Sequence, residues 1–207
     1  MSFFTAVSGL SACRCAVVHF FDSRSFDTLF FRDQSSLRRV PLKATNLPMV
    51  SESFFYSYVG AIQDQVEKAV SSELTKSGAA KVIVGGHSLG SGVACICAVL
   101  LRDYLQKVHS AAEVELCVAA TPKPGNAAFR SLLATMKCTS YANETDIIPW
   151  NPSSVIPDLT RASGLLEYVM PPGLCTFSVV APTLTGCHAV ASYRLGITAL
   201  GGAPSAK

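Results

Sequence analysis

Apolar residues along this 207-residue chain fall into short β-branched runs and longer stretches with helical spacing. The short runs predict buried strands, because Val and Ile favour extended backbone and continuous apolar runs suit a sheet covered on both faces. The longer stretches place apolar residues three and four apart, which predicts amphipathic helices. The predicted strands are Cys15–Phe21, Val82–Val84, Val114–Ala120, Cys138–Ala142 and Cys175–Ala181, and the predicted helices cover residues 54–75, the run after Gly92, the run capped by Asn126 and the stretch carrying Val190, Tyr193, Ile197 and Leu200.

Strands that alternate with helices predict an α/β fold with a mostly parallel central sheet and flanking helices, in which functional residues gather where the strands end. The length fits one domain over residues 1–207, without an internal repeat or low-complexity tract. Residues 26–49 mix aromatic and charged side chains and end in a Pro/Asn loop. This segment predicts a short amphipathic helix and a connector, an arrangement that can cover a site.

The composition is apolar, with 49% hydrophobic and 15% charged residues. Residues 82–101 carry no formal charge, but the Gly/Ser turn at their centre argues against a transmembrane segment. The net charge of +3 comes from scattered basic residues, so we expect no nucleic-acid partner and at most a transient lipid-surface contact. Arg14 follows the apolar N-terminal residues rather than preceding them, so we expect no signal peptide and slightly favour the cytoplasm, with the compartment left open.

The eight cysteines show no C-x-x-C spacing, so we expect no metal site. Cys175 and Cys187 are the one pair considered for a disulfide. The alternative is that all eight thiols are reduced and buried, and pack as small apolar side chains.

A sharp turn joins the strand at Val82–Val84 to the helix after Gly92. Here Gly86-His87-Ser88-Leu89-Gly90 fits the G-x-S-x-G nucleophile elbow, whose serine occupies a strained turn and whose glycines allow close packing of strand and helix. The helix N-terminus favours negative charge near Ser88, and the N–H of Leu89 is the natural first oxyanion donor. Such a pattern also arises by chance in glycine-rich turns, but the flanking strand and helix favour a hydrolase nucleophile.

An activated serine needs a general base, and the base needs a carboxylate that holds its tautomer. Behind a nucleophile elbow the expected chain order is serine, acid, histidine. Among the four histidines, only His188 follows every candidate acid. Asp146 is the first candidate acid because it follows a predicted strand and precedes the apolar Ile147-Ile148-Pro149, while Asp158 in a Pro-flanked loop is the alternative. The other acids between the serine and the histidine are Asp103, Glu113, Glu115, Glu144 and Glu167.

Three further stretches stand out beside the elbow: Thr121-Pro122-Lys123-Pro124-Gly125-Asn126-Ala127-Ala128-Phe129, Asn143-Glu144-Thr145-Asp146-Ile147-Ile148-Pro149 and His188-Ala189-Val190-Ala191-Ser192-Tyr193. Together with the elbow they resemble the class 3 lipases, the fungal-type triacylglycerol lipase family of α/β-hydrolases, over about Val17 to Ile197. The resemblance implies an α/β-hydrolase fold, a Ser88, Asp146 and His188 triad, and a lipid or ester substrate. It also implies that the chain is a carboxylic ester hydrolase and, within that class, a lipase acting on acylglycerols through an acyl-enzyme. Because this mechanism needs no cofactor, we expect none.

The chain departs from the family pattern near its N-terminus. The family's strand-end motif Phe-Arg-Gly-Thr/Ser is replaced here by Phe20-Phe21-Asp22-Ser23. By resemblance Ser23 supplies the second oxyanion contact, whereas Asp22 puts a carboxylate and a Cβ beside it. The chain also starts close to this strand, so we expect an N-terminally reduced fold. A catalytically weak or inactive lipid-binding protein is therefore one alternative. A phospholipase or acyltransferase is another, on which nothing in the residues decides.

Two further expectations concern segments near the proposed site. By resemblance, residues Arg24–Gln34 correspond to the family's lid helix, and a plain surface helix is the alternative. Asn143-Glu144-Thr145 is formally a glycosylation sequon. We expect it to be unmodified because it lies beside the candidate acid and because we expect no signal peptide.

Overall fold

The computed structural model describes residues 4–10, 15–21, 53–108, 110–151, 155–158 and 164–201. A six-stranded sheet in the order β1-β2-β3-β4-β5-β8 forms its centre. β1 runs antiparallel to β2, and each following pair of neighbours is parallel. The strands of this sheet are β1 (Phe4–Leu10), β2 (Cys15–Phe21), β3 (Lys81–His87), β4 (Glu113–Ala119), β5 (Lys137–Asn143) and β8 (Leu174–Phe177).

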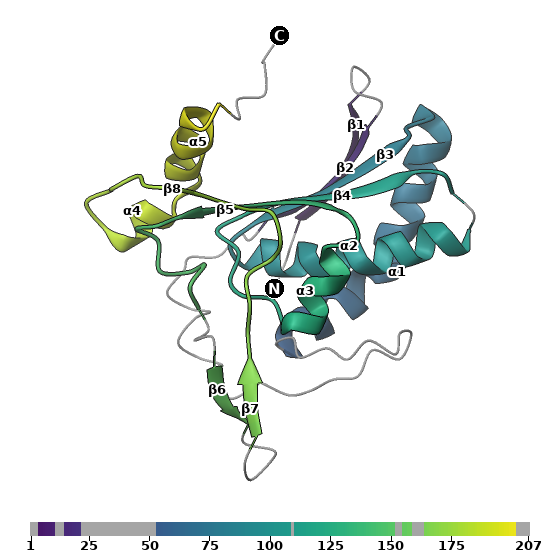
Figure 1. Cartoon of the computed structure of the whole chain (residues 1–207). Coiled ribbons are helices and arrows are strands. Elements are labelled where there is room, and N and C mark those ends of the chain that lie inside the picture. The colour runs from purple at the N-terminus through teal and green to yellow at the C-terminus, as the bar shows by residue number, and fades with distance from the viewer. Residues whose placement is uncertain are drawn as a thin grey trace.

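The helices form layers on both sides of the sheet. In Figure 1, α2 and α3 lie below the sheet, α1 rises from below to its right-hand end, and α5 lies above the sheet, with α4 beside the ends of β5 and β8. Because both neighbours of the central strands are parallel, the carboxyl ends of β3, β4 and β5 meet at one edge, where side chains from separate elements can converge. The helices are α1 (Ser53–Ser77), α2 (Leu89–Lys107), α3 (Ala127–Leu133), α4 (Leu184–His188) and α5 (Val190–Ala199).

Helix α2 is the centre of the buried core. Every residue from Gly90 to Leu101 is buried, and the same core contains Val82, Val84 and Leu116 from the two central strands. Among the described residues, α2 alone is long and apolar enough to cross a membrane, yet 72% of that apolar window is buried inside the protein. Packing against the sheet therefore accounts for the absence of charged residues from α2 up to Leu101.

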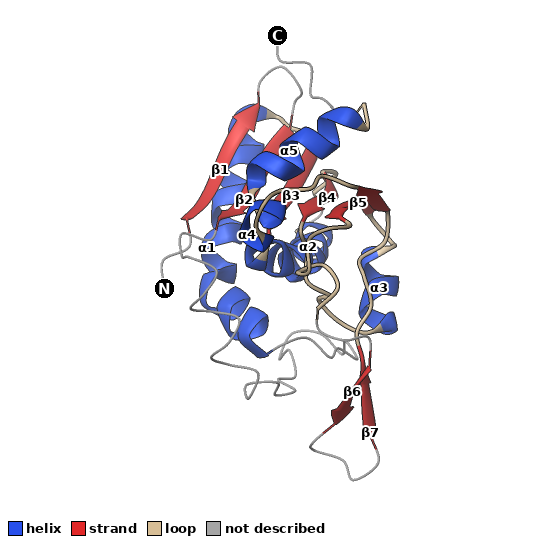
Figure 2. Ribbon diagram, turned by 90° about the vertical axis from the view of Figure 1, so that its left-hand side faces the viewer, coloured by secondary structure: helices blue, strands red, loops and turns tan. Residues whose placement is uncertain are grey.

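Most of the elements predicted from the hydrophobic pattern are confirmed. The predicted strands Cys15–Phe21, Val82–Val84, Val114–Ala120 and Cys138–Ala142 correspond to β2, β3, β4 and β5, and the helix predicted over residues 54–75 corresponds to α1. The cap is confirmed as well, since the side chain of Asn126 accepts the N–H of Phe129 at 3.0 Å. Three elements are not predicted by the hydrophobic pattern: the strand β1, the helix α4, and a two-stranded antiparallel ribbon. The ribbon consists of β6 (Val155–Asp158) and β7 (Gly164–Glu167) and extends away from the central sheet (Figure 2).

The strand predicted over Cys175–Ala181 is wrong in its second half. β8 ends at Phe177, and Val179 bonds to a side chain instead of a neighbouring strand. The N–H of Val179 donates to Oδ1 of Asn143 at 2.9 Å, and its carbonyl accepts from Nδ2 of the same residue at 2.9 Å. The β-branched residues that follow Phe177 therefore belong to a loop.

The disulfide considered between Cys175 and Cys187 is not formed, because both thiols are free. The idea that every thiol is buried fails for Cys117 and Cys175, which are exposed. It does describe the two cysteines of α2: desolvation raises the pKa of the Cys97 thiol to about 12 and that of Cys95 well above its usual value. These two side chains are thiols inside the core and pack as apolar groups.

Candidate active site

Ser88 alone connects β3 to α2, because β3 ends at His87 and α2 begins at Leu89. Its backbone has φ 57° and ψ −129°, a conformation that costs a non-glycine residue about 1–3 kcal/mol. A Cβ on Gly86 would lie 2.5 Å from the carbonyl oxygen of Gly90. Glycine at position 86 is therefore what lets the strand approach the first turn of the helix so closely.

Hydrogen bonds hold this strained turn in place. The N–H of Ser88 donates to the carbonyl of Ala119, at the end of β4, at 3.1 Å. The carbonyl of Ser88 accepts the N–H of Ser91 at 3.0 Å and also the Ser91 hydroxyl. The backbone N–H and carbonyl of Ser88 thus form hydrogen bonds with β4 and α2, and the side chain points out of the turn.

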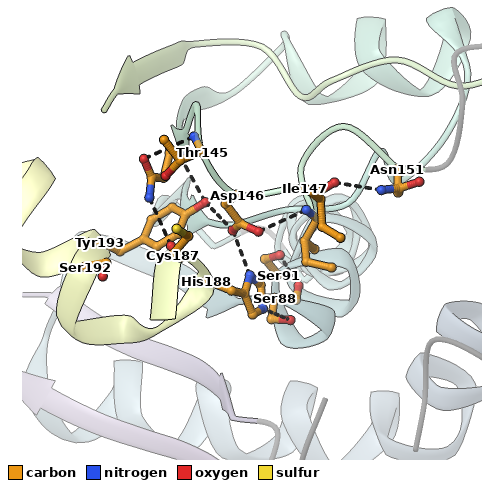
Figure 3. A network of polar contacts seen from close by, with 12 residues as sticks. Ser88, Ser91, Thr145, Asp146, Ile147, Asn151, Cys187, His188, Ser192 and Tyr193 are labelled. Carbon is orange, nitrogen blue, oxygen red and sulfur yellow. Dashed lines mark hydrogen bonds and ion pairs between the residues drawn. The ribbon is translucent and has the colours of Figure 1, made fainter. Parts of the chain in front are cut away.

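Three side chains predicted from the sequence meet at this edge of the sheet (Figure 3). Nε2 of His188 lies 2.7 Å from Oγ of Ser88, and Nδ1 of the same ring lies 2.7 Å from Oδ2 of Asp146. Asp146 is 1% exposed and His188 is 8% exposed. A hydroxyl, an imidazole and a buried carboxylate in this order can move a proton from the serine to the ring and hold the resulting positive charge.

Further hydrogen bonds orient the carboxylate of Asp146. Its Oδ1 accepts the N–H of Ile148 at 3.0 Å, and its Oδ2 accepts the hydroxyl of Tyr193 at 2.8 Å. The Tyr193 hydroxyl in turn accepts the N–H of Asn143 at 3.1 Å. Burial and the negative charge of Asp146 raise the pKa of Tyr193. The tyrosine therefore keeps its proton and remains a donor to the carboxylate.

His87 packs against the same group of rings. Its ring centroid is 4.9 Å from that of His188, at an interplanar angle of 42°, and 5.4 Å from that of Tyr193 in an edge-on arrangement. The residue before the candidate nucleophile thus packs against both the histidine and the tyrosine that contact Asp146.

The other candidates lie elsewhere. Asp158 belongs to β6 in the separate ribbon, so it is not at the edge where Ser88 lies. Glu144 is exposed. Leu89 is the first residue of α2, where backbone N–H groups have no partner within the helix. Ser23, Asp22, His109 and the predicted lid Arg24–Gln34 lie outside the described residues.

Sequence reasoning missed the site roles of Tyr193 and Asn143. The hydrophobic pattern places Tyr193 among the apolar positions of the last helix, although a tyrosine on a buried face needs a partner for its hydroxyl. In the sequence, Asn143 is only the first residue of a sequon and of a family-like stretch, with no role assigned to it, yet it is fully buried and its Nδ2 donates to the carbonyls of Val179 and Cys187. These contacts give a physical reason for the expectation that the sequon is unmodified.

Comparison with known sequences identifies the protein family to which this chain belongs. The family model described as lipase (class 3) matches residues 28–155, which is more than half of the chain and includes Ser88 and Asp146. A lipase from Rhizomucor miehei is 28% identical over 142 residues, covering 63% of this chain and 39% of the relative. The chain therefore spans well under half the length of that curated relative.

Solved structures show the same fold. A propeptide complex of Rhizomucor miehei lipase superimposes with a TM-score of 0.63 at 21% identity, over 72% of this chain and 46% of that one. A triacylglycerol lipase from Penicillium expansum superimposes with a TM-score of 0.68 at 15% identity, over 85% of this chain and 65% of that one. At these identities the likeness shows the fold, the α/β-hydrolase fold with helices flanking a mostly parallel sheet.

Proposed function

This chain belongs to the class 3 lipase family, and we propose that it is a carboxylic ester hydrolase that cleaves acylglycerols with Ser88 as its nucleophile. The observation that carries the proposal is the unbroken series of two 2.7 Å contacts from Ser88 through His188 to Asp146. The curated relative from Rhizomucor miehei is a lipase, and the similar structure from Penicillium expansum is a triacylglycerol lipase. Both support an ester of glycerol as the substrate class.

The acylation step follows from the positions of these atoms. Nε2 of His188 takes the proton of Ser88 as Oγ forms a bond to the ester carbonyl carbon, and Asp146 stabilises the imidazolium through Nδ1–H. The negative charge moves to the carbonyl oxygen, close to the N-terminus of α2, where the N–H of Leu89 is available as a donor. The tetrahedral intermediate then breaks its bond to the alcohol, which leaves with the proton from Nε2.

Deacylation repeats the same proton transfers with water. His188 takes a proton from a water molecule as the water oxygen attacks the acyl carbon, and the second tetrahedral intermediate expels Oγ of Ser88, which recovers the proton. By resemblance, the hydroxyl and N–H of Ser23 complete the oxyanion site. The acid product leaves, and the enzyme returns to its starting state.

Transient contact with a lipid surface is part of the proposal. Three apolar side chains that lie close to the triad in sequence are largely exposed: Ile147 at 45%, Val180 at 81% and Leu184 at 59%. Ile147 follows Asp146, and the other two precede His188. Exposed apolar groups beside a catalytic edge favour a substrate presented at an apolar surface.

The test compares hydrolysis of a p-nitrophenyl ester by the wild type and by Ser88→Ala, with Ser131→Ala as the control. Ser131 is an exposed serine on α3 whose hydroxyl donates to the carbonyl of Ala127. We expect turnover and labelling by a fluorophosphonate probe to disappear in Ser88→Ala and to persist in Ser131→Ala. Turnover that survives the loss of Ser88 would rule out this nucleophile.

The same preparation separates the alternative functions. If the wild type binds lipid vesicles but neither hydrolyses esters nor reacts with the fluorophosphonate, the chain is a lipid-binding relative without ester hydrolase activity. Product analysis with mixed triacylglycerol and phospholipid vesicles, in the presence of an added alcohol, identifies a phospholipase or an acyltransferase by the acyl product formed.

A further inference from the structure

Asn143, the last residue of β5, uses every polar group that it has. It is fully buried. Its main-chain N–H donates to the hydroxyl of Tyr193 at 3.1 Å, and its carbonyl accepts the N–H of Asp146 at 3.0 Å. In its side chain, Oδ1 accepts the N–H of Val179 at 2.9 Å, while Nδ2 donates to the carbonyls of Val179 at 2.9 Å and Cys187 at 3.0 Å.

The bond to Cys187 reaches the candidate general base through one peptide unit. The carbonyl oxygen of Cys187 and the Cα of His188 lie in the same planar peptide group. Fixing that oxygen therefore fixes the point from which the His188 ring extends. Because the same asparagine also accepts the N–H of Asp146, one buried residue sets the separation between the acid and the base.

We propose that Asn143 is a positioning residue for catalysis, which holds His188 at hydrogen-bonding distance from both Asp146 and Ser88. The catalytic consequence rests on the proposed ester hydrolysis. The geometric consequence, a shared Nδ1–H between His188 and Asp146, does not depend on it. Removing the Asn143 amide frees the peptide before His188 and leaves the buried carbonyl of Cys187 without this donor, which costs both alignment and stability.

Thr145 offers a way to separate alignment from general stability. Its hydroxyl donates to the carbonyl of Val179 at 2.7 Å, so it helps to hold the loop after β8. The carbonyl of Cys187, in contrast, accepts from Asn143. Thr145→Val therefore weakens the same loop and leaves the link to His188 intact. Asn151 is the second control: its side-chain amide donates to the carbonyl of Ile147 at 2.7 Å, in the same segment but at an exposed position.

The first measurement is steady-state hydrolysis of a short p-nitrophenyl ester by Asn143→Ala, at a temperature where circular dichroism shows the variant to be folded. We expect kcat to fall about 100-fold with an unchanged KM, because misplacing a catalytic group by roughly 1 Å has an effect of this size. Thr145→Val and Asn151→Ala should keep kcat within about threefold of the wild type, because neither reaches the peptide before His188. If the alanine variant does not fold, Asn143→Asp replaces it, because this variant preserves the side-chain volume and the acceptor for the N–H of Val179. We expect the same fall in kcat for it.

The second measurement is proton NMR of the imidazole N–H resonances. In the wild type we expect a strongly downfield signal from Nδ1–H of His188, assigned by its loss in Asp146→Asn. The signal should disappear or shift upfield in Asn143→Ala and Asn143→Asp, and persist in both controls. This reading needs no turnover, so it tests the position of His188 even if the ester assay shows no activity that depends on Ser88.

A folded Asn143 variant that retains both the downfield signal and a kcat within about threefold of the wild type would overturn the positioning role. The role is also overturned if Thr145→Val lowers kcat as much as Asn143→Ala, because the loss would then reflect loop stability alone. Failure of the proposed function has a different signature, which is the absence of Ser88-dependent turnover in the wild type.

Discussion

The two halves of the candidate active site are built in different ways. The serine half is local: Gly86, Ser88 and Ser91 lie within a few residues of each other and are held by the junction of β3 and α2. The acid and histidine half is assembled by contacts between distant residues. Asp146 and His188 are 42 positions apart, Asn143 and Cys187 are 44 apart, and Asp146 and Tyr193 are 47 apart.

Because of this difference, we expect changes in one half to affect mainly the stability of the fold, and changes in the other half to affect the position of the His188 imidazole. A change in the elbow disturbs the packing of α2, the centre of the core, and so acts mainly on folding. A change in the distant contacts leaves the sheet and α2 in place but alters where the imidazole lies. Apart from the nucleophile Ser88 itself, we therefore expect variants of the first half to act mainly on stability, and variants of the second half to lose kcat in addition to any loss of stability.

Asp146→Asn should have the largest effect on turnover. An amide at this position cannot hold the required tautomer of His188 or stabilise the imidazolium, so we expect kcat to fall by about 10⁴. The matched control is Glu144→Gln, since Glu144 is an exposed acid two residues earlier. A comparable loss in Asp158→Asn, with Asp146→Asn active, would assign the acid role to the other carboxylate.

Gly86→Ala should have the largest effect on folding. The new Cβ would lie 2.5 Å from the carbonyl oxygen of Gly90, so the backbone of β3 or α2 must move, at a cost of about 1–3 kcal/mol. Urea denaturation measures this loss. Gly78→Ala is the comparison, because Gly78 has φ +60° but open space around it and carries only the conformational cost of about 1 kcal/mol. Equal stabilities for the wild type and Gly86→Ala would show that the strand and the helix pack less tightly at the elbow.

Tyr193→Phe tests the distant half with a smaller change. Loss of the hydroxyl removes one donor to Asp146 and the acceptor for the N–H of Asn143, so we expect kcat to fall about 10-fold and stability to fall by about 1–2 kcal/mol. Tyr104→Phe is the matched control, since it removes a 2.9 Å bond to Ser71 far along the chain from the triad. If both variants lose stability and neither loses kcat, Tyr193 contributes only to folding.

Glu115→Gln should have the smallest effect and none on kcat. Glu115 contacts Lys81 at 2.9 Å and Lys137 at 2.7 Å. Desolvation alone would raise its pKa, but hydrogen bonds and charge from the two lysines lower it below the usual 4.5. The ion pairs therefore stabilise the protein above that pH, by up to about 1 kcal/mol, and the contribution disappears as the pH falls through the lowered pKa. Denaturation of the wild type and the variant at pH 7 and at pH 3 checks this sign; a difference that grows on acidification would contradict it.

Much of the fold follows from patterns within short segments. The run Val82–Val84, the apolar stretch of α2 and the cap at Asn126 each depend on neighbours within a few positions, and all three predictions agree with the structure. The order serine, acid, histidine also led to the three side chains that the structure brings together. Val179 shows the limit of this reasoning. The β-branched residues around it predict a strand, but its N–H and carbonyl bond to the side chain of the distant Asn143, and the segment forms a loop.

By itself, the sequence determined the elbow, the layers of helices and strands, and the candidate triad, because local propensity, glycine placement and chain order encode them. Only the tertiary structure decided which polar side chains support that triad. Tyr193 looks like a core aromatic and Asn143 like a loop residue until β5, α4 and α5 are placed side by side. Their hydroxyl and amide then become buried and must find partners, and the partners they find are Asp146 and the peptide that carries His188.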